Sequence, residues 1–408
     1  MTEHHPSLGA TFDPLQVQAE LPYTFYARLR REEPITFSPS INAYLVSRYE
    51  DIRFIVSRPD LFALKNPFFS GIEVYPETIT ELSKGYLFIP STISEKARRD
   101  KLHESFRKHL SAASIRAIEP SIRKIATRLI DRFASNGQAE LISQFIYPFP
   151  LEVLLTILGI PQQDMEMVKK QNDDFRRGIT LPLSPEEQVE CARQFVTLQR
   201  YYAHLVEEKR KHPGQDLISD LIRYCTTGED PLSDADLVNE ITGVFNAGYE
   251  TPAHMLGNGL VLLLEEPTCW QALYEHPEHI PQALEEILRM RGPVLGFMRT
   301  TTQELTIGGV TMPPETNLLL LYASGNLDES HFPQADNFEI QRQPNHHLAF
   351  GHGIHFCPGT ALARLEGRIA FEALTQRIPN MRIVPDQQFE YGFRFSNYGY
   401  KRIYIQWD

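Results

Sequence analysis

The stretch Phe350-Gly351-His352-Gly353-Ile354-His355-Phe356-Cys357-Pro358-Gly359 decides how the 408-residue chain is interpreted. It is punctuated by glycine and proline, and it leads into Thr360–Glu366, which is predicted to be helical. A cysteine just before a helix lies where unpaired backbone amides and the helix dipole stabilise negative charge. Such a position lowers the pKa of a thiol, so the sequence predicts a thiolate at Cys357.

Two interpretations of this cysteine compete. A lone cysteine in an intracellular protein is usually a small buried hydrophobe. In this stretch, however, Gly351 and Gly353 let the backbone turn tightly and approach a flat partner closely. Pro358 removes one amide near the sulfur, and the remaining amides can donate to it and tune a metal–thiolate bond. A thiolate held in this way can be the axial ligand of a haem iron.

The spacing F-G-x-G-x-H-x-C-x-G, followed by A-x-A-R-x-E, resembles the haem-binding signature of the cytochrome P450 family. The resemblance implies that Cys357 is the thiolate ligand of haem b and that His355 donates to a haem propionate. It also implies that Phe350 and Gly351 contact the cofactor. The fold it implies is mainly α-helical with a small β region, in a single domain over residues 1–408 with a short N-terminal tail of about residues 1–14.

The composition limits the class of protein and its location. Hydrophobic residues make up 42% and charged residues 23%, which is ordinary for a globular enzyme, and the net charge of −12 argues against a nucleic-acid binder. The four cysteines show no CxxC spacing, which fits a reducing compartment. The start lacks the pattern of a signal peptide, and the apolar run at 151–160 is too short to span a bilayer. We therefore expect a soluble, bacterial-type cytoplasmic protein without a membrane anchor.

Hydrophobic periodicity and turn residues predict the order of the elements. Helices are expected at 22–33, 49–58, 95–211, 233–264 and 281–290, with 95–211 broken at Pro161, Pro182 and Pro185. Strands are expected at 42–47 and 318–322, and hairpins at 304–311 and 389–407. Residues 62–92 are predicted to be a long loop, which by resemblance covers the substrate pocket. Residues 175–180 are predicted to be a turn between two helices that form a lid in the family.

A second motif, Ala247-Gly248-Tyr249-Glu250-Thr251-Pro252, lies inside the predicted helix at 233–264. Pro252 has no amide for the carbonyl of Gly248, so the helix should open there. Gly248 admits a close neighbour, and Thr251 can hydrogen-bond toward the opened turn. A simple proline kink is the alternative explanation. The motif resembles the oxygen-activation motif of the family, which implies catalytic roles for Thr251 and for Glu250 as a proton relay, and contact of Gly248 with the cofactor. Pro252 departs from the small residue usual in the family.

Two further groups of charged residues fit the resemblance. Glu286 and Arg289 share one helical face, where an exposed pair is the ordinary interpretation. The family pairs this E-x-x-R with an arginine before the cysteine, and Arg342 has that position, so the trio is predicted to be a buried structural network. The resemblance assigns haem propionates to Arg299, and also to Arg99 and His103, although Arg98 and Arg107 compete for the latter assignment.

Several large apolar residues fall in segments that contact substrate in the family, although each alone is as readily explained as ordinary core. The predicted pocket residues are Phe68, Phe69, Leu87, Val244, Phe245, Ala247, Val294, Leu295, Phe297, Phe395 and Asn397. They favour a sizeable hydrophobic or aromatic substrate, with Arg394 or Asn397 as an anchor for a polar group.

The resemblance implies a monooxygenase that inserts one oxygen atom from dioxygen into a hydrophobic small molecule, for example in secondary metabolism. No G-x-G-x-x-G opens a βαβ unit, so electrons are expected from a separate ferredoxin and its reductase. That partner would dock near Cys357, where Arg107, Lys108 and Arg364 supply positive charge. Two alternatives remain open: the same fold used for coupling, desaturation or peroxide-driven oxidation, and a non-catalytic haem-binding sensor.

Overall fold

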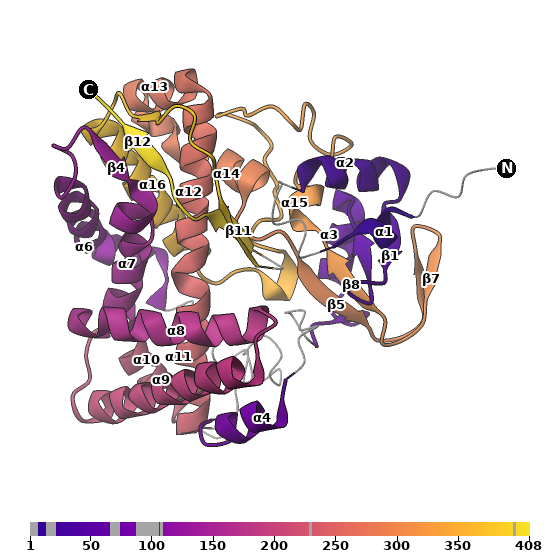
Figure 1. The fold of residues 1–408 in the computed structure, drawn as a ribbon, viewed down its shortest axis with the longest axis horizontal. Helices are drawn as coiled ribbons and strands as arrows, with labels where there is room; N and C mark the ends of the chain where they lie inside the picture. The colour runs from indigo at the N-terminus through magenta and orange to yellow at the C-terminus, as the bar shows by residue number, and fades with distance from the viewer. Residues whose placement is uncertain are drawn as a thin grey trace.

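The computed structural model describes residues 7–13, 22–65, 74–86, 106, 109–227, 231–394 and 397–408. Figure 1 shows a larger helical region on one side and a smaller β-rich region on the other, where the N-terminal elements lie against strands from residues 297–320. The predicted proportion of helix to sheet is therefore correct.

The β-rich region is built on a five-stranded sheet whose strands come from distant parts of the sequence. Its order is β1 (Ile35–Ser38), β2 (Ala43–Val46), β8 (Asn317–Leu320), β5 (Phe297–Thr301) and β3 (Phe62–Ala63). β2 and β8 run parallel, with Val46 opposite Leu320, and the other pairs are antiparallel. The short helices α1 (Leu8–Thr11), α2 (Tyr23–Glu32) and α3 (Tyr49–Ser57) supply buried residues to the clusters that cover this sheet.

Three smaller sheets complete the β structure. The predicted hairpin at 304–311 is confirmed as β6 (Leu305–Ile307) and β7 (Val310–Met312), joined by Gly308 and Gly309 at φ of +56° and +80°, a conformation that requires glycine. Of the predicted hairpin at 389–407, β10 (Tyr391–Arg394) and β11 (Asn397–Tyr400) pair with each other. The last strand, β12 (Tyr404–Gln406), instead joins β4 (Gln138–Glu140) and β9 (Arg382–Ile383).

The helical region surrounds α12 (Glu250–Glu265), which is buried on nearly all sides and apolar to match. The other helices of this region are α6 (Ala112–Asp131), α7 (Pro148–Leu158), α8 (Met165–Thr180), α9 (Pro185–Lys211), α10 (Leu217–Cys225), α11 (Asp234–Gly248), α13 (Pro267–Glu275), α14 (Ile280–Arg291) and α16 (Thr360–Arg377). Two short helices, α4 (Pro76–Leu82) and α15 (Tyr322–Gly325), lie outside this group. None of the described helices is long and apolar enough to cross a bilayer.

The start of α11 follows local rules that the sequence displays. Ser233 Oγ accepts from the Asp236 amide at 3.2 Å, and Asp236 Oδ2 accepts from the Ser233 amide at 2.9 Å. This reciprocal capping box satisfies two amides that the helix leaves unpaired. The predicted start at Ser233 is confirmed.

Several local predictions are wrong. Residues 175–180 are not a turn, because α8 runs through them to Thr180 and the connection is made by residues 181–184, where Ser184 caps α9. The predicted helical stretch at 95–211 contains the strand β4. With three residues, this strand is too short to show a hydrophobic periodicity in the sequence. The expected N-terminal tail contains α1, anchored by buried Leu8 and Phe12. The predicted loop at 62–92 contains β3 and α4, while residues 66–73 and 87–92 lie outside the described residues.

Candidate functional site

Cys357 lies in a loop that its own backbone holds closed. Its amide donates to the Phe350 carbonyl at 3.0 Å, and the Gly351 amide donates to the Leu348 carbonyl at 2.8 Å. Gly351 and Gly353 have φ of +72° and +70°, so both glycines are required by the backbone conformation. α16 begins three residues after the cysteine, as the sequence predicts.

The environment of the Cys357 sulfur has opposing effects on its acidity. Burial raises the pKa of the Cys357 thiol, while hydrogen bonds from Gly359 and Thr360 and the charge of Arg364 lower it. The net direction is upward, so the prediction of a lowered pKa from the helix start alone is wrong for the protein chain by itself. The reason is that burying a thiolate anion away from water costs free energy. A metal cation coordinated to the sulfur would offset this cost and lower the pKa.

The helices that carry the two motifs start at the same end of the helical region. A Cβ at Gly367 would come within 3.1 Å of Met255, and one at Gly259 within 3.1 Å of Phe371, so α12 and α16 pack with the same chain direction. Thr251 lies one turn before Met255, and Cys357 precedes the first turn of α16. The open helix turn and the cysteine loop therefore lie at the same end of this helix pair.

The helix is interrupted at Tyr249, between α11 and α12, one residue after the carbonyl that Pro252 was predicted to free. Thr251 Oγ1 donates to the Ala247 carbonyl at 2.7 Å, which is the predicted bond toward the opened turn. Ala247 is exposed and Thr251 only half-buried, although neighbouring Glu250 and Phe245 are buried. One face of this segment is therefore accessible to solvent.

A family model for cytochrome P450 matches residues 60–379, which is most of the chain. The chain is a cytochrome P450. The chain is 31% identical over 369 residues to the putative cytochrome P450 YjiB of Bacillus subtilis, covering 89% of each chain. It is 32% identical over 373 residues to the mycinamicin IV hydroxylase/epoxidase of Micromonospora griseorubida, covering 90% of each. The crystal structure of the haem domain of CYP116B5 from Acinetobacter radioresistens matches with a TM-score of 0.92 and 28% identity over 98% of each chain.

This P450 is therefore a haem b monooxygenase with the single-domain P450 fold. Its own residues fit the cofactor. Arg299 on β5 is only 5% exposed; its Nη1 donates to the Met298 carbonyl at 2.8 Å, and it has no acidic partner within the described part of the chain. A buried cation needs a counter-charge, which a haem propionate would supply. His355 lies half-buried in the turn two residues before Cys357.

The second predicted catalytic residue, Glu250, is not a free carboxylate. It forms an ion pair with Arg176 of α8, and the two side chains are 5% and 10% exposed. Arg176 Nη1 also donates to the Asn246 carbonyl at 3.0 Å, and Tyr249 Oη donates to Asp173 of α8. The helix α8 is thus tied to the interrupted segment on both sides of Tyr249.

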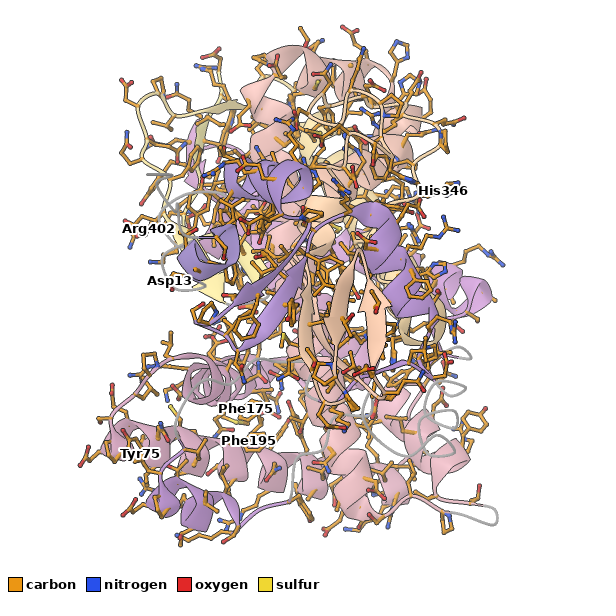
Figure 2. The ribbon with its side chains drawn as sticks, turned by 90° about the vertical axis from the view of Figure 1, so that its right-hand side faces the viewer. Asp13, Tyr75, Phe175, Phe195, His346 and Arg402 are labelled. Atoms are coloured by element: carbon orange, nitrogen blue, oxygen red, sulfur yellow. The ribbon has the colours of Figure 1, made fainter. Side chains whose placement is uncertain are left out.

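The neighbouring helix α9 packs against α8 through a stacked pair of aromatic rings. Phe175 and Phe195, labelled in Figure 2, face each other from α8 and α9 with centroids 3.9 Å apart. The ion pair with Glu250 and the ring stack leave α8 with contacts on two sides. No pattern in the sequence indicates the role of Arg176, because its partner lies 74 positions away and the segment is predicted to be a turn.

The predicted structural trio lies together in the interior. Arg289 donates to Glu286 at 2.7 and 2.8 Å, and Arg342 Nε donates to Glu286 at 2.9 Å. The remaining guanidinium donors reach backbone carbonyls of the irregular segment, those of Asn326, Pro333, Gln334, Ala335 and Asn337. The trio therefore attaches that segment to α14.

The pocket residues that the structure describes divide into two groups. Ala247 is exposed, and Val244, Val294, Phe297 and Asn397 are half-buried; Val294 and Asn397 are joined by a β-bridge. Two predicted pocket residues are corrected. Phe245 is fully buried against Tyr202 and Tyr249, on the face of α11 away from Ala247. Leu295 is buried in the cluster that covers the five-stranded sheet.

Gly248 also has an explanation in helix packing. A Cβ at this position would lie 2.9 Å from Leu154 Cδ1 of α7, so a packed helix requires glycine here, and the predicted contact with the cofactor stays a prediction. Nine residues named from the sequence lie outside the described residues: Arg98, Arg99, His103, Arg107, Lys108, Phe68, Phe69, Leu87 and Phe395.

Proposed function

We propose that this P450 uses Cys357 as its axial thiolate and oxidises a sizeable hydrophobic small molecule by inserting one oxygen atom. The observation that carries the proposal is the common end of α12 and α16, which brings Thr251 and the Cys357 loop to one region. Bound haem supplies the chemistry that activates dioxygen. The protein supplies the ligand, the counter-charges and the polar groups around it.

The proposed roles follow from the contacts of each side chain. Cys357 provides the sulfur, which accepts from the Gly359 amide, while the Thr360 hydroxyl donates to the Cys357 carbonyl. Arg299 and His355 bind the propionates, Arg299 because its buried charge lacks an acidic partner among the described residues. The hydroxyl proton of Thr251 is used by the Ala247 carbonyl, so its oxygen is left to accept a hydrogen bond from a water molecule or a proton donor in the site.

The substrate class is inferred from the half-buried residues that remain in the predicted wall. Val244, Ala247, Val294 and Phe297 are apolar, and Asn397 is a polar group beside them. We infer a hydrophobic substrate with at least one polar substituent. The name of the Micromonospora relative describes a hydroxylase and epoxidase of mycinamicin IV, a finding about that protein that supports a bulky substrate here.

We propose that electrons come from a ferredoxin-type protein docking near Cys357. Ile354 and Phe356 lie shortly before the cysteine and are each 47% exposed, which offers an apolar contact. Arg364 contributes less positive charge than predicted, because Glu285 pairs with it in two hydrogen bonds. A Phe356→Glu variant is expected to slow reduction by ferredoxin and leave reduction by dithionite unchanged; equal ferredoxin rates would contradict the docking site.

The decisive experiment tests the ligand first. Cys357→Ser is expected to lose the long-wavelength Soret band of the reduced, carbon monoxide-bound form, while Cys191→Ser keeps it. Retention of that band in Cys357→Ser would reject the thiolate assignment. A haem-loaded protein with the band but without any product from dioxygen and a surrogate reductase, over a broad substrate panel, would favour the sensor alternative.

The pocket is tested by substrate-induced spectral changes. Bulky apolar compounds are expected to shift the resting iron to high spin, because they displace water from the site. Ala247→Phe and Val244→Trp should weaken that binding at least tenfold, since both side chains would fill the accessible face of α11. The matched control is Ala117→Phe, an exposed alanine on α6. If only small charged compounds gave the shift, and both pocket variants bound like the control, the pocket assignment would fail.

A further inference from the structure

A charged cluster lies beside the cysteine loop, and it includes Arg364, whose contribution to the docking site is reduced by its pairing with Glu285. Arg364 of α16 donates to Glu285 of α14 in a bidentate pair, Nε to Oε1 at 2.6 Å and Nη2 to Oε2 at 2.7 Å. Bidentate pairs fix both the position and the orientation of the guanidinium. The two side chains are 40% and 27% exposed, so the pair lies at the edge of the interior.

A buried histidine completes the cluster. His347 has a side chain that is only 4% exposed, and its Nε2 lies 3.2 Å from Glu285 Oε2. Its Nδ1 accepts from the Ala349 amide at 3.2 Å, which places the imidazole proton on Nε2, where it donates to the carboxylate. Burial raises the pKa of Glu285, but the hydrogen bonds from Arg364 and His347 outweigh it and hold that pKa at about 2. Glu285 is therefore ionised at neutral pH.

The cluster reaches the cysteine loop through one aromatic ring. The Arg364 guanidinium lies over the Phe350 ring, 4.9 Å from its centroid, and the Phe350 carbonyl accepts from the Cys357 amide at 3.0 Å. The positive charge of Arg364 is also felt at the sulfur. Fixed charges near a partly buried centre interact with it more strongly than they would in water.

We propose that Glu285 and Arg364 act on the reduction potential of the haem in opposite directions, and that Glu285 also holds Arg364 in its position beside the cysteine loop. The inference rests on Cys357 being the iron ligand. The ferrous centre carries one more negative charge than the ferric centre. The positive charge of Arg364 alone would favour the ferrous state, and the negative charge of Glu285 alone would favour the ferric state, so the intact pair nearly balances them.

The charge balance makes a prediction that a purely structural pair does not. Glu285→Gln leaves Arg364 uncompensated and is expected to raise the reduction potential. Arg364→Gln leaves Glu285 uncompensated and is expected to lower it. The double variant carries no net charge at the pair and is expected to return close to the wild-type value. A pair that only joins α14 to α16 would instead shift both single variants in the same direction, or neither.

The experiment is a spectroelectrochemical titration of the purified, haem-loaded protein and its variants. Each single variant should change the ferrous-to-ferric ratio at a fixed applied potential about threefold, or ~28 mV, since tenfold is 59 mV for one electron. The control is Glu372→Gln, which removes ion pairs with Arg123 and Arg368 farther along α16 and should leave the potential unchanged.

The carbon monoxide spectrum separates this inference from the proposed function. If every variant keeps the long-wavelength band, the thiolate is intact, and unchanged or same-direction potentials overturn the role of the pair alone. Loss of the band from the wild-type protein would overturn the ligand assignment itself. If a single variant fails to bind haem, the double variant and Arg364→Lys are used in its place, because both keep the net charge of the pair at zero. A reduction potential far from the wild-type value in either of them would refute the charge balance.

Discussion

The Glu286 network and the Arg176–Glu250 pair are both buried groups of arginine and carboxylate, but they differ in how their polar atoms are used. In the network, three charged side chains fix an irregular segment whose carbonyls accept the remaining donors. The Arg176–Glu250 pair instead joins two helices, α8 and the start of α12, with one further bond to the Asn246 carbonyl. The network is therefore part of the scaffold, whereas the pair controls how α8 meets the site.

The largest effect is expected when the network loses its carboxylate. Glu286→Gln leaves Arg289 buried without a counter-charge and leaves Arg342 with only the exposed Glu339, which costs about 3–5 kcal/mol of the free energy of unfolding. Denaturant unfolding followed by haem absorbance measures it. The control is Glu339→Gln, because Glu339 is 43% exposed and its pair with Arg342 should matter little. Equal stability of the two variants would contradict a structural role for the network.

Breaking the helix-to-helix pair tests the other half of the comparison. Arg176→Gln leaves Glu250 buried and unpaired, and we expect a loss of about 3 kcal/mol. The double variant Arg176→Gln/Glu250→Gln should recover part of it, with a coupling energy of about 1–3 kcal/mol, because no charge is left buried. In the network, Glu286→Gln/Arg289→Met should not recover, since the carbonyls of Asn326 and Ala335 lose their donors. If both double variants recovered stability relative to their single variants, the proposed difference between the network and the Arg176–Glu250 pair would be wrong.

Glu285 gives a third arginine–carboxylate group, intermediate in exposure. Because its folded-state pKa is about 2 against an ordinary 4.5, its contribution to stability is present above about pH 4.5 and lost as pH falls toward 2. At about 1.4 kcal/mol per pKa unit, the contribution is at most roughly 3 kcal/mol. Acid titration of the unfolding free energy should be flatter in Glu285→Gln than in wild type over this window. An identical pH profile would show that the pair adds no stability.

The smallest effect on stability is expected at Thr251. Thr251→Ala removes one hydrogen bond, to the Ala247 carbonyl, worth about 1 kcal/mol or less. Haem and substrate binding should be retained, while reducing equivalents go to peroxide or water in place of product. The ratio of product formed to NAD(P)H consumed measures this. A ratio equal to wild type would exclude Thr251 from oxygen activation and leave it a helix-packing residue.

Features set by neighbours in sequence were predicted correctly. The cysteine loop, the capping box at Ser233 and the turn at Gly308–Gly309 depend on backbone conformations and amides within seven residues of each other. The interruption near Pro252 has the same origin, because a missing amide acts on the turn directly before it. These local features were sufficient to indicate the family and its cofactor.

The tertiary structure decided which charged groups meet and which way side chains face. Arg176 and Glu250 are 74 residues apart, and Glu285 and Arg364 are 79 apart, so no local rule connects them. Phe245 and Ala247 are near neighbours on α11, yet one is fully buried and the other exposed, because packing against α7 and α9 fixes the orientation of the helix. The sequence by itself determined the ligand loop and the helix break. Packing between distant helices decided the partners of Glu250 and Arg364, because ion pairs depend on distances in space and not on spacing along the chain.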